Sequence, residues 1–255
     1  MKRKLVFLPL LIFILIGILS CNKERKATVA AAANLRYVLE EIKTQYLKDY
    51  PGANIQITYG SSGILTQQII NGAPFDLFMS ADTKFPNKLE DRGLTSASAV
   101  NYCYGKVALW SSSLNLSQGL SSVLLPEVKK IAIANPNNAP YGLNSVNALK
   151  KQNLYDKVKN RIVWGENINQ TAQFAFSGNA EIGFIALSLA LAPEMKNKGN
   201  YYVLPEDICP PIAQAAVLIN GWEKNGEAAR FLDYLISSKC DSIWDKYGYG
   251  LPEKE

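Results

Sequence analysis

The chain has 255 residues, with 27 Lys+Arg against 22 Asp+Glu and no histidine. Without imidazole, capture of a transition-metal cation and hydrolysis by a histidine-based triad are both disfavoured. The basic residues are not concentrated in any segment, so nucleic-acid binding is not expected either.

The first residues predict export. A basic Lys2-Arg3-Lys4 run precedes the apolar residues 5–19, and a small residue, a cysteine and a polar run follow. This order is typical of a secretory signal peptide, with an apolar core short for a membrane span. Residues 18–21, ILSC, resemble a bacterial lipobox, so residues 1–20 are interpreted as a lipoprotein signal peptide and Cys21 as its lipidation site. An uncleaved anchor helix is the alternative, and both interpretations place the folded part outside the cytoplasm, tethered to a membrane.

Strand-like and helix-like segments alternate over the first hundred residues. Strands are predicted at 28–33, 54–59 and 76–79, and helices at 35–47 and 64–71, with Pro51-Gly52 ending the first helix. A β-α-β-α alternation predicts a mainly parallel sheet covered by helices.

A second unit of the same kind begins near Gly105. Strands are predicted at 106–110, 130–134, 162–164 and 182–187, with helices at 143–152 and 170–177. A last strand at 213–219 and a helix at 228–237 close the chain. Because no linker or repeat separates the units, we expect two α/β lobes joined by crossing strands. Ligands of α/β folds bind at the carboxyl ends of strands, so a cleft between the lobes is the expected site.

Four strand-to-helix turns carry small or polar residues: Ala33-Asn34-Leu35, Ser61-Ser62-Gly63, Pro140-Tyr141-Gly142 and residues 166–169. A helix start leaves backbone N–H groups unpaired and carries partial positive charge. Four starts converging on one cleft would form an anion cage without any lysine or arginine. Each turn alone has a plainer interpretation, because Asn34 is a favoured helix cap and serines are ordinary turn residues.

Six ordered motifs carry a family resemblance: AAANL at 31–35, GSSG at 60–63, GAPFDLFMSAD at 72–82, NPNNAPYGL at 135–143, GFIAL at 183–187 and YGY at 247–249. Together they resemble the periplasmic molybdate-binding proteins. The resemblance implies a two-lobed periplasmic-binding-protein fold of type II. Residues 27–104 with 210–255 would form lobe 1, and residues 105–209 lobe 2, with the ligand between them.

The same resemblance implies which residues hold a tetrahedral oxyanion. Matched motif by motif, they are Asn34 with its neighbour Ala33, Ser62 with its neighbour Ser61, Tyr141, and the backbone N–H of Ile168. The ligand would be molybdate or tungstate, molybdenum would enter only as molybdate through the same residues, and no cofactor is implied.

Two positions depart from the commoner family pattern. Asn34 stands where serine is usual, and Ala186 stands where many relatives present a tyrosine hydroxyl. We therefore expect the Asn34 side-chain amide to donate to the ligand in place of that hydroxyl.

Three cysteines follow Cys21, and their spacing is too wide for a metal knuckle. In an oxidising compartment one pair of them could form a disulfide. By the family resemblance, Cys103 and Cys209 fall on the two segments that cross between the lobes, so a hinge disulfide is one alternative. Asp82 is expected to fix a loop near the cleft.

The resemblance implies a monomeric lipoprotein that delivers its oxyanion to the permease of an ABC importer. The nearest alternative is a binder of sulfate, phosphate or another small anion. Catalysis has little support, since the single Ser-x-x-Lys match, Ser20 to Lys23, lies at the cleavage site and no P-loop is present. Molybdate and tungstate are nearly the same size, so the sequence does not separate them.

Overall fold

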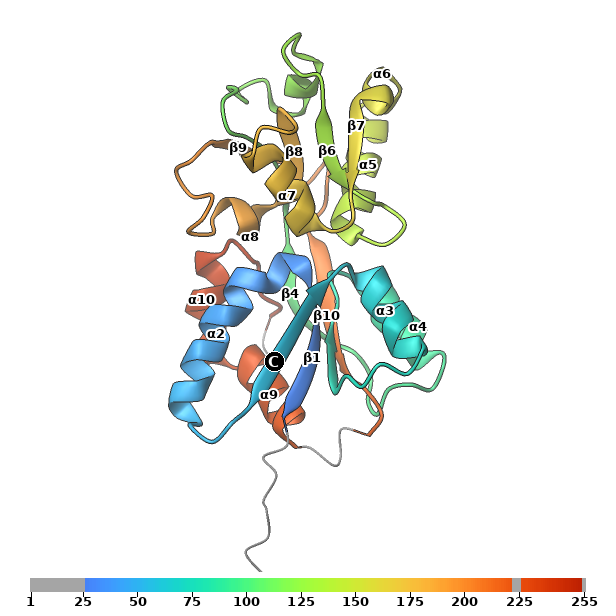
Figure 1. Ribbon diagram of the computed structural model, residues 1–255, viewed down its shortest axis with the longest axis vertical. Helices are drawn as coiled ribbons and strands as arrows, with labels where there is room; N and C mark the ends of the chain where they lie inside the picture. Colours follow the sequence, from blue (N-terminus) through green and yellow to red (C-terminus); the bar gives the residue numbers. More distant parts are fainter. Residues whose placement is uncertain (1–25, 222–225, 254–255) are drawn as a thin grey trace, which may run out of the picture.

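The computed structural model describes residues 26–221 and 226–253, which form two α/β lobes stacked along the long axis of the molecule (Figure 1). The predicted signal peptide and Cys21 lie outside these residues. Within the described ranges, no helix combines the length and apolar character that a membrane span requires. The two-lobed α/β class expected from the sequence is confirmed.

Lobe 1 is built on a five-stranded sheet of order β2-β1-β3-β10-β4. β1 pairs in parallel with β2 and β3, whereas β10 runs antiparallel to both β3 and β4. The strands are β1 (Ala27–Ala32), β2 (Ile55–Gly60), β3 (Leu77–Met79), β4 (Val100–Gly105) and β10 (Ile212–Leu218). The sheet is therefore mixed, and the expectation of a mainly parallel sheet holds only for β1 to β3.

Helices cover both faces of this sheet (Figure 1). They are α2 (Arg36–Asp49), α9 (Glu227–Ile236) and α10 (Asp241–Lys246) on one face, and α3 (Ser62–Ile70) and α4 (Lys84–Glu90) on the other. Alternate strand residues point to opposite faces, so Ala30 and Phe78 join Leu65 and Leu89 in a small core under α3 and α4. The residues on either side of Ala30 and Phe78 in these strands point to the opposite face and belong to the main core: Val29, Ala31, Leu77 and Met79.

Lobe 2 repeats the design with a sheet of order β7-β6-β8-β5-β9. Its strands are β5 (Val107–Ser111), β6 (Ile131–Ala134), β7 (Ile162–Gly165), β8 (Ile182–Ala186) and β9 (Asn200–Val203). Its helices are α5 (Pro140–Lys151), α6 (Tyr155–Val158), α7 (Ile168–Phe176) and α8 (Leu187–Ala190). Short 3-10 turns complete the two lobes: η1 (Ala33–Leu35), η2 (Gly119–Leu124), η3 (Lys159–Arg161) and η5 (Ser238–Cys240).

The strands that cross between the lobes explain why both sheets are mixed. The chain leaves lobe 1 through β4 and enters lobe 2 through β5, with Lys106 between the two strands, and it returns between β9 and β10. The carboxyl ends of β1, β2, β6 and β7 all face the junction of the lobes (Figure 1). A strand that arrives from the other lobe must run against these strands, and so β10 and β5 pair with their neighbours in antiparallel fashion.

Candidate functional site

A closed pocket lies at the junction of the lobes, where four helix starts meet. Each start follows a strand: β1 leads into η1, β2 into α3, β6 into α5 and β7 into α7. The pocket is small, with a cavity volume of about 10 Å³. Its lining includes all six residues singled out from the sequence: Ala33, Asn34, Ser61, Ser62, Tyr141 and Ile168. The tertiary fold thus brings together turns that are more than a hundred residues apart.

The serine turn of lobe 1 supplies two buried hydroxyls. Ser61 is the residue before α3, but its side chain makes no capping bond. It is 4% exposed, and its Oγ has no hydrogen-bond partner among the described residues. Ser62 Oγ accepts a 3.0 Å hydrogen bond from the backbone N–H of Ala81. A buried hydroxyl without a partner costs about 1–3 kcal/mol, so Ser61 points to a ligand that would accept its hydrogen bond.

The first turn of lobe 1 is arranged differently from the expectation. The Nδ2 group of Asn34 donates to Gln214 Oε1 at 3.0 Å and to the Tyr249 hydroxyl at 2.9 Å. Both amide hydrogens are therefore used within the protein, and the side chain is not a free donor to the pocket. That the Asn34 amide donates to a ligand stays a prediction, and it would require the amide to give up one of these two partners. The backbone N–H groups of η1 remain as the donors that this turn offers.

In lobe 2, the start of α5 places Tyr141 at the pocket. Pro140 is the first helical residue, and the preceding Ala139 has no side-chain cap. Because proline has no N–H, Tyr141 carries the first unpaired backbone donor of this helix. Gly142 allows the close approach that the turn needs, since a Cβ there would lie 1.9 Å from the carbonyl oxygen of Ala134.

The start of α7 presents Ile168 for a similar reason. Asn167 caps this helix, with its Oδ1 accepting from the N–H groups of Asn169 and Gln170 at 3.0 and 3.1 Å. The cap thus pairs the N–H groups of the second and third residues of the helix. The N–H of Ile168, the first residue, is left without a bond to the cap. Ile168 is 4% exposed and lines the pocket. Ile168 can therefore donate to a ligand through its backbone N–H, although its side chain is apolar.

The pocket is electrically neutral apart from the helix starts. Among the described residues that line it there is no lysine, arginine, aspartate or glutamate. Burial raises the pKa of the Tyr141 hydroxyl well above its usual range, so this group stays protonated. Unpaired N–H groups and helix starts favour negative charge, and buried hydroxyls add hydrogen-bond donors. The arrangement suits a small anion that carries several acceptor oxygens.

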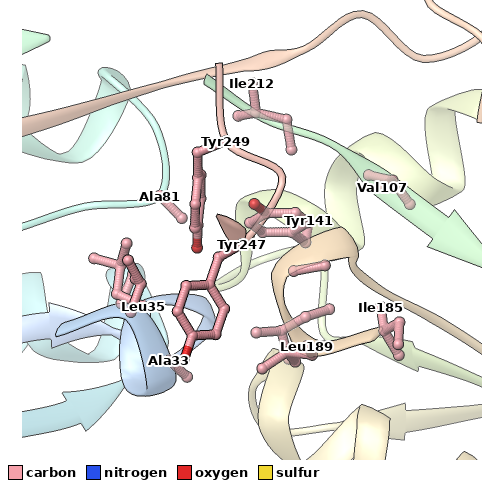
Figure 2. Close-up of a cluster of buried hydrophobic side chains, with 14 of the residues drawn as sticks. Ala33, Leu35, Ala81, Val107, Tyr141, Ile185, Leu189, Ile212, Tyr247 and Tyr249 are labelled. Carbon is pink, nitrogen blue, oxygen red and sulfur yellow. The ribbon is translucent and has the colours of Figure 1, made fainter. Parts of the chain in front are cut away.

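Sequence reasoning missed a buried polar cluster beneath the pocket. It consists of Asn34, Gln214, Tyr141, Tyr102, Tyr249 and Ser188, and we call it the inner cluster. Gln214 is fully buried in β10, and its Nε2 donates to the Tyr141 hydroxyl at 3.0 Å. Figure 2 shows Tyr141 and Tyr249 in the buried cluster at the junction of the lobes. Gln214 is the single polar residue in the otherwise apolar strand 212–218, and this was the one feature of the sequence that could have indicated the inner cluster.

Contacts across the junction show that the lobes are closed over the pocket. The backbone N–H of Gly63 in lobe 1 donates to the carbonyl oxygen of Asn138 in lobe 2 at 2.8 Å. Ser188 Oγ donates to the carbonyl oxygen of Asn34 at 3.0 Å. Asn34, Ser62 and Tyr141 are at most 2% exposed as a result. A ligand could enter only after the lobes move apart.

Two other sequence-based expectations concern residues near the junction. Cys103 and Cys209 are both buried and are not joined by a disulfide. Asp82 Oδ1 accepts from the Ser80 hydroxyl at 3.0 Å and from the backbone N–H of Phe85 at 3.2 Å. Asp82 thus holds the loop between β3 and α4, as expected.

Comparisons with known proteins agree with this geometry. Residues 27–250 match the family model described as bacterial extracellular solute-binding protein. The molybdate-binding protein of Azotobacter vinelandii is 37% identical over 92% of this chain and 94% of its own length. That of Rhodobacter capsulatus is 34% identical over 86% of each chain. The solved periplasmic molybdate-binding protein of Azotobacter vinelandii superimposes with a TM-score of 0.84, covering 89% of this chain and all of that one.

Proposed function

The chain belongs to the bacterial extracellular solute-binding proteins, alongside the molybdate-binding proteins, and we propose that it captures molybdate for an ABC importer. The proposed site is the closed pocket between the lobes. Ser61 and Ser62 would donate through their hydroxyls. The turns at Ala33–Asn34, Tyr141 and Ile168 would donate through backbone N–H groups. We propose a binding role with no catalytic step.

The unpartnered hydroxyl of Ser61 carries this proposal. It is buried in a pocket formed by four helix starts, where an anion would supply the missing acceptor. Hydrogen bonds between such donors and an ionised oxygen are about twice as strong as those between neutral groups. A tetrahedral dianion has enough oxygens to meet donors from both lobes at once. Binding would therefore stabilise the closed form, which is the form a permease can distinguish from the open one.

The donor set also limits which anions fit. Hydrogen phosphate carries an O–H that needs an acceptor, and two donors facing each other in a buried site would cost about 1–3 kcal/mol. Sulfate lacks that O–H, so the pocket must discriminate against it by size. Tungstate is nearly as large as molybdate, and the proposal includes it. Sulfate, phosphate or another small anion is the alternative that the relatives do not favour.

The cellular setting completes the proposal. Membership of this family places the protein outside the cytoplasm. We propose that residues 1–20 are removed and that a lipid on Cys21 holds the protein at the membrane. Two acyl chains suffice for stable anchoring, whereas one gives only reversible binding. The protein would act as a monomer beside its permease.

Calorimetric titration of residues 22–255 with molybdate, tungstate, sulfate and phosphate tests the proposal. We expect tight binding of molybdate and tungstate, weak or no binding of sulfate and phosphate, and a matching rise in melting temperature. At a hundredfold excess over the dissociation constant, a ligand adds about 2.7 kcal/mol to the free energy of unfolding. Tight sulfate binding without molybdate binding would support the alternative. No heat and no thermal shift with any of the four ions would overturn the assignment of an oxyanion site.

A further inference from the structure

One side-chain amide joins the two halves of the proposed molybdate site. Gln214 Oε1 accepts from Asn34 Nδ2 at 3.0 Å, and Gln214 Nε2 donates to the Tyr141 hydroxyl at 3.0 Å. Asn34 belongs to the first turn of lobe 1, and Tyr141 begins α5 in lobe 2. Each residue also carries backbone that lines the pocket. The two ends of a single glutamine therefore contact one site residue from each lobe.

The position of Gln214 on the chain adds to this role. It lies in β10, the strand that enters lobe 1 from the hinge, and the pairing of β10 with β4 shifts register directly after it. Gln214 is fully buried, as are its partners. The surroundings are tight, because a Cβ on Gly105 would lie 2.3 Å from Gln214 Nε2 and 2.0 Å from the Tyr141 hydroxyl. The glycine in the crossing segment leaves room for this hydrogen bond.

The hydrogen bonds of Gln214 fall into two kinds. The Tyr102 hydroxyl lies 3.1 Å from Gln214 Oε1 and 2.8 Å from the carbonyl oxygen of Ser80, and all of these groups belong to lobe 1. The bond to Tyr141 crosses to lobe 2. Opening the lobes would break the crossing bond and preserve the bonds within lobe 1. Only the crossing bond can then contribute to the difference in free energy between the open and closed forms.

We propose that Gln214 is a positioning residue that favours the closed form by holding Tyr141 of lobe 2 against Asn34 of lobe 1. The inference rests on the proposed molybdate site. Gln214 does not line the pocket, so it acts on the anion through Asn34 and Tyr141, the two pocket residues that it contacts. Its loss should leave encounter with the anion unchanged and should speed release, because release requires the lobes to open.

Two tyrosine variants separate this role from a purely structural one. Tyr141→Phe removes the hydroxyl that bonds Gln214 across the lobes, and Tyr102→Phe removes a hydroxyl that bonds the same amide within lobe 1. Rates would be measured by stopped-flow tryptophan fluorescence with molybdate, using Trp244, whose ring lies 5.3 Å from that of Tyr249. The slope of the observed rate against molybdate concentration gives the association rate constant, and the intercept gives the dissociation rate constant.

We expect Tyr141→Phe to raise the dissociation rate constant about five- to tenfold, the effect of one net hydrogen bond, with an unchanged association rate constant. Tyr102→Phe should change neither rate constant more than about twofold and should instead lower the free energy of unfolding. Gln214→Leu should raise the dissociation rate constant at least as much as Tyr141→Phe. Adding Tyr141→Phe to Gln214→Leu should produce no further increase, because the shared bond is already gone.

The outcomes distinguish the two proposals. If the unmodified protein binds molybdate and Tyr141→Phe releases it no faster than Tyr102→Phe, the positioning role is wrong and the binding site stands. If Gln214→Leu does not fold, the two tyrosine variants still decide the question. If the unmodified protein binds none of the four oxyanions, the proposed function is wrong and this inference falls with it.

Discussion

The lobes meet beneath the pocket and again at its outer rim, and the two contacts are built from different groups. The inner cluster contains only neutral amides and hydroxyls, all of them buried. At the rim, the Tyr37 hydroxyl of α2 donates to the exposed carboxylate of Glu194 in lobe 2. The Arg36 guanidinium lies beside it, 5.3 Å from the centre of the Tyr59 ring. Of these two contacts, the buried one is therefore made by neutral groups and the exposed one includes charged groups.

The difference follows from the cost of burying charge. An isolated ion loses several kcal/mol of hydration when it is buried, so a fixed cation or carboxylate beneath the pocket would need its own partner. The neutral inner cluster leaves the helix starts to meet the charge of the anion. The rim can hold Glu194 and Arg36 because both side chains stay partly hydrated. We expect variants that break a bond between the lobes in the inner cluster to change affinity strongly, and variants at the rim to change it little.

The largest effect should come from a steric block at the contact between Gly63 of lobe 1 and Asn138 of lobe 2. In Gly63→Ala, the new Cβ would lie 2.8 Å from the backbone Cα of Asn138 in the other lobe. The lobes could not close fully, so molybdate affinity should fall on the order of 100-fold, or about 2.7 kcal/mol. Calorimetry measures the affinity, and small-angle scattering with molybdate measures closure.

Gly52→Ala is the matched control for this change. No atom lies within 4 Å of a Cβ at Gly52, and its turn is exposed. This variant should bind molybdate like the unmodified protein. Full closure and unchanged affinity in Gly63→Ala would show that the lobes adapt at this contact, and that its tight packing does not limit binding.

A smaller effect is expected at the serine turn, where two neighbouring hydroxyls should behave differently. Ser61→Ala removes a group with no partner in the protein, so affinity should fall about five- to tenfold while the free energy of unfolding stays the same or rises slightly. Ser62→Ala also removes the acceptor for the Ala81 N–H and should lower both quantities, each by about 1 kcal/mol. Calorimetry and denaturant titration of the two variants measure the contrast. A loss of unfolding free energy in Ser61→Ala would mean that its hydroxyl has a partner in the ligand-free protein.

At the rim, Tyr37→Phe should reduce molybdate affinity about twofold or less. The hydroxyl it removes bonds an exposed carboxylate, and contacts of this kind contribute little because water replaces them. Measurement at low and high salt would separate this contact from any attraction between Arg36 and the anion. A loss as large as that of Ser61→Ala would place the rim among the determinants of binding and would contradict the comparison.

The smallest effect should be that of pH. Burial raises the pKa values of Tyr102, Tyr141 and Tyr249 well above the usual tyrosine range. A raised pKa keeps each hydroxyl protonated, and its hydrogen bonds are lost only as the pH rises through that higher value. Molybdate affinity should therefore stay constant between about pH 7 and 9. Isothermal titrations across this range measure it, and a fall in affinity near pH 8 would show that a group of the inner cluster titrates there.

The elements and turns of this protein could be predicted because their signals are local. Apolar residues at helical spacing marked α2, and a short apolar run marked β6. Small and polar residues before a helix marked all four turns of the pocket. Strands β4 and β9 were not predicted. In β4, Val100 and two tyrosines alternate with smaller or polar residues, which is a local strand signal that the sequence analysis did not use.

The sequence by itself determined that two α/β units are present and which turns offer unpaired donors, since each depends on residues close together in the chain. Only the tertiary structure decided how those donors are used. Asn34 meets Gln214 and Tyr249, 180 and 215 residues further along, and these partners accept both hydrogen bonds of its amide. Hydrogen bonds over such separations follow from the closed packing of two lobes. That packing leaves no periodic pattern in the sequence, and its one local sign is Gln214 within an otherwise apolar strand.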